Sequence, residues 1–287
     1  MPIKNLGLAY ILLSVFFASL MVILIKYLSD YMNIYSILFY RGFFGFILVL
    51  PFFLKLNPNI LITKRIHIHF IRSIVNALAL YFWFTSLTLS SLADVSAIGN
   101  SAPIFATLLA ILFMKEKIFF SRITAIVFGF VGVIIILNPH FDYIELGHYY
   151  ALTAAVLWGF LVVFLKNLSR TENSFSVIFY FQLFLFVSFG IFFYDFIEVT
   201  DKLNFVLILF LALFGNLSQI CYFQALKLKD ITFISPFEYL RFIFLTVFGI
   251  IFFYEYPNLR TYIGSFVIFL GILILNFKFN FLKKEIK

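Results

Sequence analysis

Cysteine occurs only once in the 287 residues, at position 221 inside an apolar segment. A disulfide framework needs pairs of cysteines and a thiolate metal site needs several, so both are excluded. Charged residues are also scarce, at 12% of the chain against about 25% in a soluble domain. No polar stretch is long enough to form a separate soluble domain. With 64% hydrophobic residues and a mean hydropathy of +1.09, the composition is that of an integral membrane protein.

Sequence motifs of several enzyme classes are missing as well. No glycine-rich loop is followed by Lys and Ser or Thr, which argues against an ATP-driven pump. No paired carboxylates and no nucleophile–base arrangement indicate hydrolysis. His67 and His69 lie in a basic segment without further ligands, so a metal site is not predicted. We therefore expect a protein that is not an enzyme and that needs no cofactor.

Ten apolar runs are long enough to cross a bilayer, for which about 20 helical residues suffice. The first run lacks a small-residue cleavage site and is too long for the core of a signal peptide, so we interpret it as a retained helix. The predicted fold class is an all-α integral membrane protein with ten transmembrane helices. The expected spans are residues 6–28, 33–54, 68–88, 91–114, 122–139, 148–166, 174–194, 204–227, 231–253 and 259–279.

The distribution of basic residues predicts the orientation of these spans. With the amino terminus placed in the cytoplasm, 16 of the 21 Lys and Arg residues fall near cytoplasmic ends. Only Lys26, Lys202 and Arg260 fall outside, and Arg41 and Arg241 lie within spans. Such an excess follows the positive-inside rule and favours ten helices with both termini in the cytoplasm. The net charge of +8 therefore reflects membrane topology, and nucleic-acid binding is not expected.

Residues recur at a spacing of 139–140 positions, which indicates an internal repeat. Each half contains five spans, an odd number, so the second half enters the membrane from the opposite side. The sequence therefore predicts two inverted-topology five-helix repeats, at residues 1–142 and 143–287. Matching pairs include Lys26 and Lys166, Ser36 and Ser176, Tyr40 and Tyr180, Glu116 and Glu255, and Gly132 and Gly271.

Inverted repeats are typical of secondary transporters, whose substrate sites lie near mid-membrane where the halves meet. Charged side chains inside spans favour the same interpretation, because ionisable groups in a membrane usually serve function. Glu238 and Arg241 are three residues apart, so they can pair on one helix face, just after Pro236. Arg41 lies about two turns into the second span. The alternatives are a purely structural ion pair, and snorkelling of Arg41 to the outer interface.

Other polar and aromatic residues are also expected at mid-span. Pro103 and Pro236 each remove a backbone hydrogen bond and can kink their helices, which shapes a cavity. Most aromatic side chains of this chain are expected to face lipid or fill the core, and a minority to form a box for a flat or cationic ligand. The predicted substrate-binding residues are Arg41, Glu238, Tyr239, Arg241, Trp158, Asn100, Trp83 and Asn216, with Pro103 and Pro236 shaping the cavity.

Several short motifs recur in the two halves of the chain. The first half contains Phe39-Tyr40-Arg41, then Pro103-Ile104-Phe105 followed by Lys115-Glu116, Gly129 and Gly132, and the second half contains Glu255, Gly264 and Gly271. These motifs resemble those of the EamA-type family of the drug/metabolite transporter superfamily, with Phe242 where that repeat usually has proline. The resemblance covers essentially the whole chain and implies the ten-helix fold. Members of this family carry amino acids, nucleotide-linked compounds, sugars and other metabolites.

Within this family, the segment from Ser235 to Arg241 resembles S-adenosylmethionine uptake carriers, with the order of acid and base reversed. The resemblance implies a carrier of a small zwitterionic metabolite, S-adenosylmethionine or an amino acid, that works by alternating access in a bacterial inner membrane. Under this interpretation Arg41 and Arg241 hold a carboxylate, Glu238 and Tyr239 hold an amine, and Trp158 contacts a flat or sulfonium-bearing part.

Three other functions remain open at this stage. An exporter of amino acids or other metabolites would have the same fold. A membrane enzyme for lipid-linked substrates would need an acid–base cluster at the interface, and none is visible. A scaffold or receptor would not need charges inside spans. The expected partners are a small-molecule substrate and the bilayer, and a homodimer, proton coupling, exchange and facilitated diffusion all fit the sequence.

Overall fold

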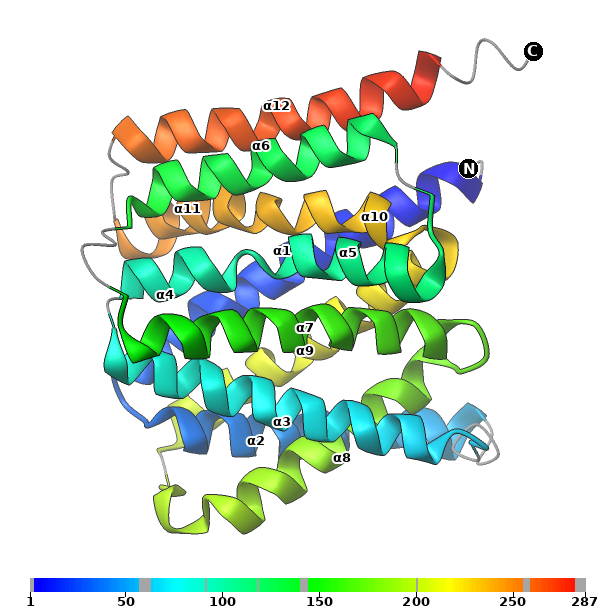
Figure 1. Cartoon of the computed structure of the whole chain (residues 1–287). Coiled ribbons are helices and arrows are strands. Elements are labelled where there is room, and N and C mark those ends of the chain that lie inside the picture. Colours follow the sequence, from blue (N-terminus) through cyan, green and yellow to red (C-terminus); the bar gives the residue numbers. More distant parts are fainter. Residues whose placement is uncertain are drawn as a thin grey trace. The chain divides into compact units, whose positions relative to one another are not determined.

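The structure, a computed structural model, describes residues 3–56, 63–90, 92–117, 119–139, 144–199, 201–254 and 259–281. All regular structure within these ranges is helical, which confirms the predicted fold class. The helices are α1 (Ile3–Ser29), α2 (Ile34–Leu56), α3 (Ile66–Leu89), α4 (Leu92–Gly99), α5 (Ala102–Met114), α6 (Phe120–Leu137), α7 (Leu146–Ser169), α8 (Ser174–Phe192), α9 (Lys202–Leu228), α10 (Ile231–Ile234), α11 (Leu240–Phe253) and α12 (Leu259–Phe281), with the 3-10 turns η2 (Tyr194–Phe196) and η3 (Ser235–Tyr239) (Figure 1).

Nine helical segments of the described ranges are long and apolar enough to cross a membrane, and Leu259–Ile274 adds a shorter tenth. This agrees with the ten predicted spans, but two of them are interrupted. The span predicted at 91–114 consists of α4 and α5, and that at 231–253 consists of α10, η3 and α11. Interrupted spans place backbone polar groups at membrane depth, which is tolerated where they are buried in protein or line a cavity.

The chain divides into two compact units, and each unit combines two separate stretches of sequence. The first unit is Met1–Ala77 with Phe164–Leu228, and the second is Leu78–Val163 with Lys229–Lys287. Helices α3 and α7 therefore each contribute one part to each unit. The boundary predicted between the sequence repeats, at 142/143, lies outside the described residues.

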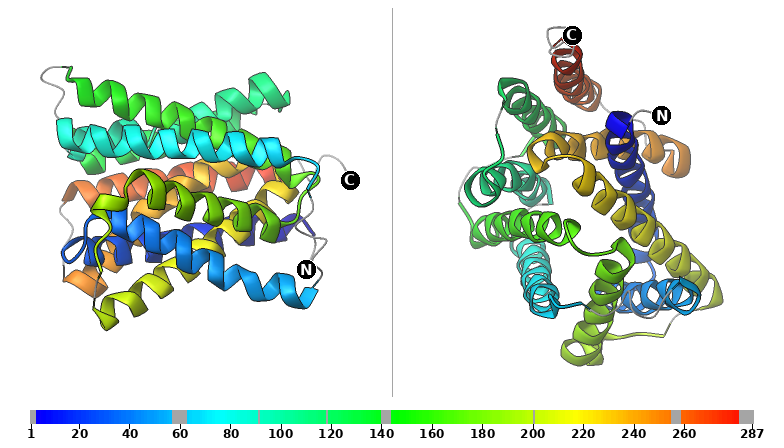
Figure 2. Two further views of the ribbon diagram at one scale, coloured as in Figure 1. Left: turned by 90° about the horizontal axis from the view of Figure 1, so that it is seen from below. Right: turned by 90° about the vertical axis from the view of Figure 1, so that its right-hand side faces the viewer.

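In the first unit, α1 packs along α9 and α2 packs against both α8 and α9 (Figure 2). Leu28, Ile37 and Leu211 belong to a buried apolar cluster between α1, α2 and α9. Helices α2 and α8 approach closely at Gly42, where an added Cβ would lie 2.6 Å from the backbone nitrogen of Phe186. Close packing through small residues is how membrane helices associate without a hydrophobic driving force.

In the second unit, α6 and α12 lie side by side over much of their length (Figure 1). Gly132 and Gly264 meet at this contact. An added Cβ at Gly132 would lie 2.6 Å from the carbonyl oxygen of Gly264, and one at Gly264 would lie 2.5 Å from that of Gly132. The two backbones are therefore in direct contact, since neither position has room for a side chain.

Helix ends repeat with the same spacing as the sequence. Asn33 caps α2 by accepting the backbone N–H of Ser36, and Asn173, 140 positions later, caps α8 through that of Phe175. Lys115 and Tyr254, 139 positions apart, end α5 and α11 with φ angles of 54° and 55°. Matching caps are what a duplicated five-helix unit predicts at the level of local structure.

The start of the interrupted segment at 231 is fixed by Glu116 from the turn between α5 and α6. Its two carboxylate oxygens accept the backbone N–H groups of Ile231 and Thr232 at 2.9 and 3.0 Å. Arg122 of α6 adds an ion pair to Asp230, with 3.1 Å between Nη2 and Oδ2. These contacts satisfy orphan N–H groups at a helix start and set the direction of the segment that carries Glu238.

Candidate functional site

The predicted site residues are divided between the two units. Arg41 and Asn216 lie in the first unit. The second unit holds the larger set, which consists of Trp83, Asn100, Pro103, Trp158, Pro236, Glu238, Tyr239 and Arg241.

The charged pair of the second unit lies where its helix is interrupted. Pro236 stands in the first turn of η3, and because proline has no N–H the α-helical ladder cannot run through it. The segment Ser235–Tyr239 adopts the tighter 3-10 form instead, and the hydroxyl of Ser235 donates to the carbonyl of Ile231 at 2.9 Å. A 3-10 stretch inside a span often marks a functional hinge.

Glu238 and Arg241 form the ion pair that their spacing predicts. Arg241 Nη2 lies 3.0 Å from Glu238 Oε2, and the two side chains are 39% and 21% exposed. Arg241 Nε is buried and has no hydrogen-bond partner among the described residues. The pair is thus only partly covered by protein and keeps unused donors and acceptors, which is what recognition of a zwitterion requires.

Tyr239 is 1% exposed and packs with Val133 and Ile268 in the core of the second unit. Its ring lies directly against Gly129 of α6, at the place where a side chain at 129 would be. The buried hydroxyl has no hydrogen-bond partner in the described part of the chain. Since buried hydroxyls are normally satisfied, this oxygen is a candidate contact for a ligand.

Trp83 of α3 and Trp158 of α7 form an aromatic pair in the second unit. Their ring centroids are 5.1 Å apart and the planes are inclined by 53°. The ring of Trp83 also lies against Gly99, at the end of α4, where an added Cβ would collide with it. The pair therefore lies beside the interruption between α4 and α5, and it presents electron-rich faces that suit a flat or cationic group.

The interruption between α4 and α5 differs from what the sequence predicts for Pro103. This proline lies in the first turn of α5, where the N–H of an ordinary residue would have no helical partner, so Pro103 starts a helix rather than kinking one. The amide of Asn100 donates to the carbonyl of Ser96 at 2.7 Å, which leaves its side-chain oxygen unused among the described residues.

In the first unit, the guanidinium of Arg41 packs over Gly215 of α9. A Cβ at Gly215 would lie 3.4 Å from Arg41 Nε and 3.6 Å from Nη2. Arg41 Nε is buried, and Arg41 makes no ion pair or hydrogen bond with the described residues. A guanidinium at membrane depth requires an anionic or carbonyl partner, so Arg41 remains a candidate for binding an anionic group.

Asn216 lies in a buried network with Gln182 and Gly45. Asn216 Oδ1 accepts a short hydrogen bond from Gln182 Nε2, and Asn216 Nδ2 donates to the carbonyl of Gly45 at 2.9 Å. Both polar atoms of Asn216 are therefore engaged within the protein, and the network joins α2, α8 and α9. This geometry indicates a structural role for a residue that the sequence assigns to substrate binding.

Two buried polar residues near the start of α3 were missed by the sequence interpretation. Arg72 is 5% exposed and His69 is 1% exposed, although His69 was interpreted as part of a basic segment and Arg72 was counted only as a basic residue near a cytoplasmic helix end. The sequence signal that could have indicated the burial of Arg72 is its position, because it lies six residues inside α3 and four residues inside the predicted span.

Apolar spans, two of them interrupted, with an ion pair at one interruption, are features that polytopic membrane transporters have. The chain belongs to the EamA-like transporter family, whose model matches residues 5–138 and again residues 145–277. The family assignment made from the motifs is thereby confirmed. Glu255, one of those motif residues, lies outside the described residues.

Several characterised proteins are similar to this chain over most of their length. An S-adenosylmethionine uptake transporter of Rickettsia bellii is 26% identical over 273 residues, covering 92% of this chain and 91% of the relative. A riboflavin transporter of Brucella anthropi is 27% identical, covering 81% and 84%. A pseudopaline exporter of Pseudomonas aeruginosa is 23% identical, covering 94% and 95%.

One solved structure also has the same fold. It superposes with a TM-score of 0.78 over 95% of both chains at 14% sequence identity. At this identity the likeness concerns the fold alone.

Proposed function

We propose that this protein is a secondary transporter that takes up S-adenosylmethionine, or a closely related zwitterionic metabolite, by alternating access. The observation that carries the proposal is the Glu238–Arg241 pair, 3.0 Å apart at the interruption of a membrane span. Charges at membrane depth are costly and therefore usually serve function, and a zwitterion has one group of opposite sign for each member of this pair. The name of the Rickettsia bellii relative supplies the particular substrate.

In this proposal each group of the substrate has its own partner. Arg241 binds the carboxylate, because guanidinium–carboxylate hydrogen bonds are charge-assisted and can be bidentate. Glu238 and the buried hydroxyl of Tyr239 bind the ammonium group. The faces of Trp83 and Trp158 attract the flat ring and the sulfonium centre. Asn100 offers a side-chain oxygen, and Arg41 offers a second cationic site in the first unit.

The proposed setting is a bacterial inner membrane, which the bacterial relatives support. The excess of basic residues near one set of helix ends supports both termini in the cytoplasm. The proposed repeats are residues 1–142 and 143–287. Each is too small to enclose the substrate alone in an inverted-repeat carrier, so the functional unit is the whole chain. Association into a homodimer is compatible with this unit.

The experiment that tests the proposal is uptake of radiolabelled S-adenosylmethionine into proteoliposomes containing the full-length protein. We expect saturable uptake, strongly reduced by unlabelled S-adenosylmethionine and unaffected by a metabolite without an amino-acid moiety. A pH gradient applied in parallel separates proton coupling from exchange and facilitated diffusion. Absence of both uptake and binding across a panel of zwitterions would contradict the proposal and favour a scaffold.

Export of a related metabolite is the second candidate, favoured by the name of the Pseudomonas aeruginosa relative. The same proteoliposomes, loaded with substrate, report efflux. The riboflavin transporter of Brucella anthropi suggests a flat ligand, which the Trp83–Trp158 pair would also suit. Competition between riboflavin and S-adenosylmethionine for uptake decides between these substrates.

A further inference from the structure

The first half of α3, in the first unit, has its polar face turned inward. His69, Arg72, Ser73 and Asn76 follow the spacing of one helix face, and all four are buried or half-buried. The opposite face carries Phe70, Ile71 and Ile74, which are exposed. When the polar side of a membrane helix faces away from lipid, that side is available to contact another polar group or a ligand.

This polar face packs against α8. The guanidinium of Arg72 lies over the ring of Phe181, 5.0 Å from its centroid, and Arg72 Nη1 is 3.4 Å from the carbonyl of Val177. The imidazole of His69 lies 4.7 Å from the ring of Tyr180. Arg72 Nε and both ring nitrogens of His69 are buried and have no hydrogen-bond partner among the described residues. Arg72 has no carboxylate partner in the described part of the chain.

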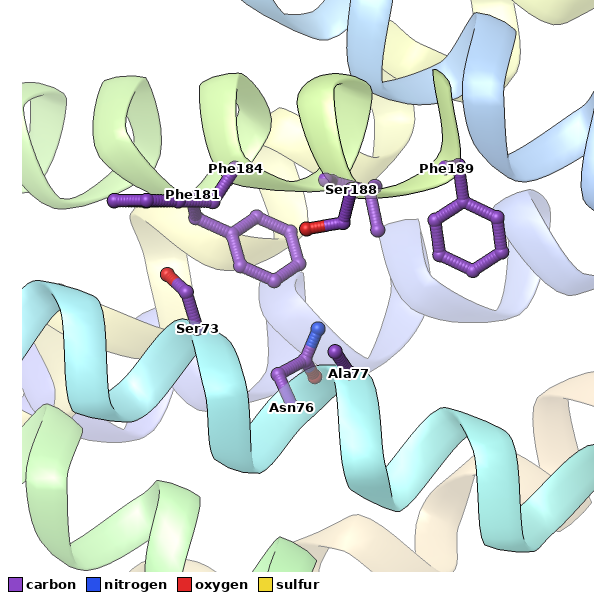
Figure 3. A pocket seen from close by; sticks show the side chains of 8 residues that line it. Ser73, Asn76, Ala77, Phe181, Phe184, Ser188 and Phe189 are labelled. Atoms are coloured by element: carbon purple, nitrogen blue, oxygen red, sulfur yellow. The ribbon is translucent and has the colours of Figure 1, made fainter. Parts of the chain in front are cut away.

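A small cavity of about 10 Å³ lies one turn further along the same face (Figure 3). Ser73 and Asn76 line it from α3, and Phe181, Ser188 and Phe189 line it from α8. Figure 3 shows the amide of Asn76 and the hydroxyl of Ser188 on opposite walls. Neither of these two side chains has a hydrogen-bond partner among the described residues. Phe181 thus contacts both the cavity and the guanidinium of Arg72, which does not itself line the cavity.

We propose that this face of α3 and α8 is a binding site for a small monovalent anion, a halide or a carboxylate group. Arg72 supplies the positive charge, and Asn76 and Ser188 supply N–H and O–H donors. No acidic side chain of the described residues neutralises Arg72, so an anion is the missing complement. The cavity is at the lower limit for a single water, so a halide or a carboxylate group, which is larger, fits only once the Phe181 ring turns, and the same turn lets the ion reach the guanidinium.

The proposal does not depend on which metabolite is transported, because its test uses simple salts. The purified full-length protein is heated in sodium chloride and in sodium gluconate at equal ionic strength, with intrinsic tryptophan fluorescence as the readout. We expect a saturable rise in Tm of roughly 2–4 °C in chloride, because a ligand that binds only the folded state stabilises it. Equal Tm values in gluconate and in each of the smaller anions chloride, bromide, acetate and formate overturn the proposal, because gluconate is too bulky for the cavity.

Sodium acetate and formate distinguish the two sources of the anion. A rise in Tm with chloride and bromide, and not with acetate or formate, assigns the site to a free halide. A larger rise in Tm with acetate and formate than with chloride assigns the site to a carboxylate. If acetate then gives no further rise in protein saturated with the transported metabolite, the carboxylate is the metabolite's own. Both outcomes retain an anion bound at Arg72.

Variants place the effect at this cavity. Arg72→Gln is expected to abolish the chloride effect, and Ser188→Ala and Asn76→Leu, which keep the guanidinium, are expected to raise the chloride concentration needed by about tenfold. Arg170→Gln, which changes an exposed arginine in the connection between α7 and α8, is the matched control and should respond to chloride as the unmodified protein does. The proposal is overturned if Arg72→Gln shows the same rise in Tm with chloride as the unmodified protein. If Arg72→Gln does not fold, an unchanged rise in both Ser188→Ala and Asn76→Leu overturns it.

Discussion

The ring of Tyr239 lies against the backbone of Gly129, where only the absence of a side chain makes room for it. Gly129→Ala is therefore expected to displace the ring, because the atoms it would meet are at the fixed base of the ring rather than at a flexible end. We expect the free energy of unfolding to fall by about 1–3 kcal/mol. Thermal unfolding in detergent measures the loss of stability. An uptake assay measures the loss of transport that we expect from displacing the Tyr239 hydroxyl.

The matched control is Gly190→Ala in α8. Its added Cβ would lie 3.1 Å from the edge of the Phe39 ring, which can move by a few tenths of an ångström. Stability close to that of the unmodified protein is expected there. Equal losses in both variants would show that the Tyr239 ring is not specially confined.

Arg241→Met tests the charge that is assigned to the carboxylate. The side chain keeps its length and loses its charge-assisted hydrogen bonds, which are worth about 1.5–3 kcal/mol, so uptake should fall by roughly tenfold or more. The protein should still insert into membranes, since the residue is 39% exposed. Arg260→Met, at the exposed start of α12, is the control that should transport normally. Normal uptake by Arg241→Met would remove this arginine from the proposed site.

Trp158→Ala tests the aromatic pair. Loss of one face of the Trp83–Trp158 pair removes a cation–π contact of about 0.5–2 kcal/mol, so the apparent affinity for S-adenosylmethionine should fall by about 2- to 30-fold. Trp158→Phe keeps an aromatic face and should retain much of the affinity. A substrate affinity unchanged in Trp158→Ala would mean that the pair is only packing.

Asn216→Ala tests whether Asn216 is structural. The substitution leaves Gln182 Nε2 and the carbonyl of Gly45 without their buried partners, which costs about 1–3 kcal/mol of stability. Uptake by the molecules that remain folded should keep its half-saturation concentration. A raised half-saturation concentration with unchanged Tm would return Asn216 to the substrate site.

The sequence was sufficient for the spans, for the family and for the pairing of Glu238 with Arg241. Span lengths follow from bilayer thickness, and residues three apart on a helix are neighbours whatever surrounds them. Rules of this kind depend only on the local sequence and not on the other helices, and for that reason the predictions of the spans and of the ion pair were confirmed.

The features that the sequence did not predict concern contacts between helices. Arg72 was counted near a cytoplasmic helix end because the positive-inside rule considers only distance from that end, whereas its burial depends on Phe181 and Val177 of α8. Asn216 is predicted to bind substrate because a polar side chain at membrane depth usually serves function, and its contacts with Gln182 and Gly45 of two other helices could not be predicted from its position. Pro103 was expected to kink a helix, and it begins one because the break lies just before it.

The contact between Gly132 and Gly264 has a consequence for how this protein can change over generations. A methyl group at either position would collide with the backbone carbonyl oxygen of the other, so each position accepts only glycine while α6 and α12 stay this close. A substitution at either glycine therefore requires α6 and α12 to move apart before a second substitution elsewhere can compensate for it.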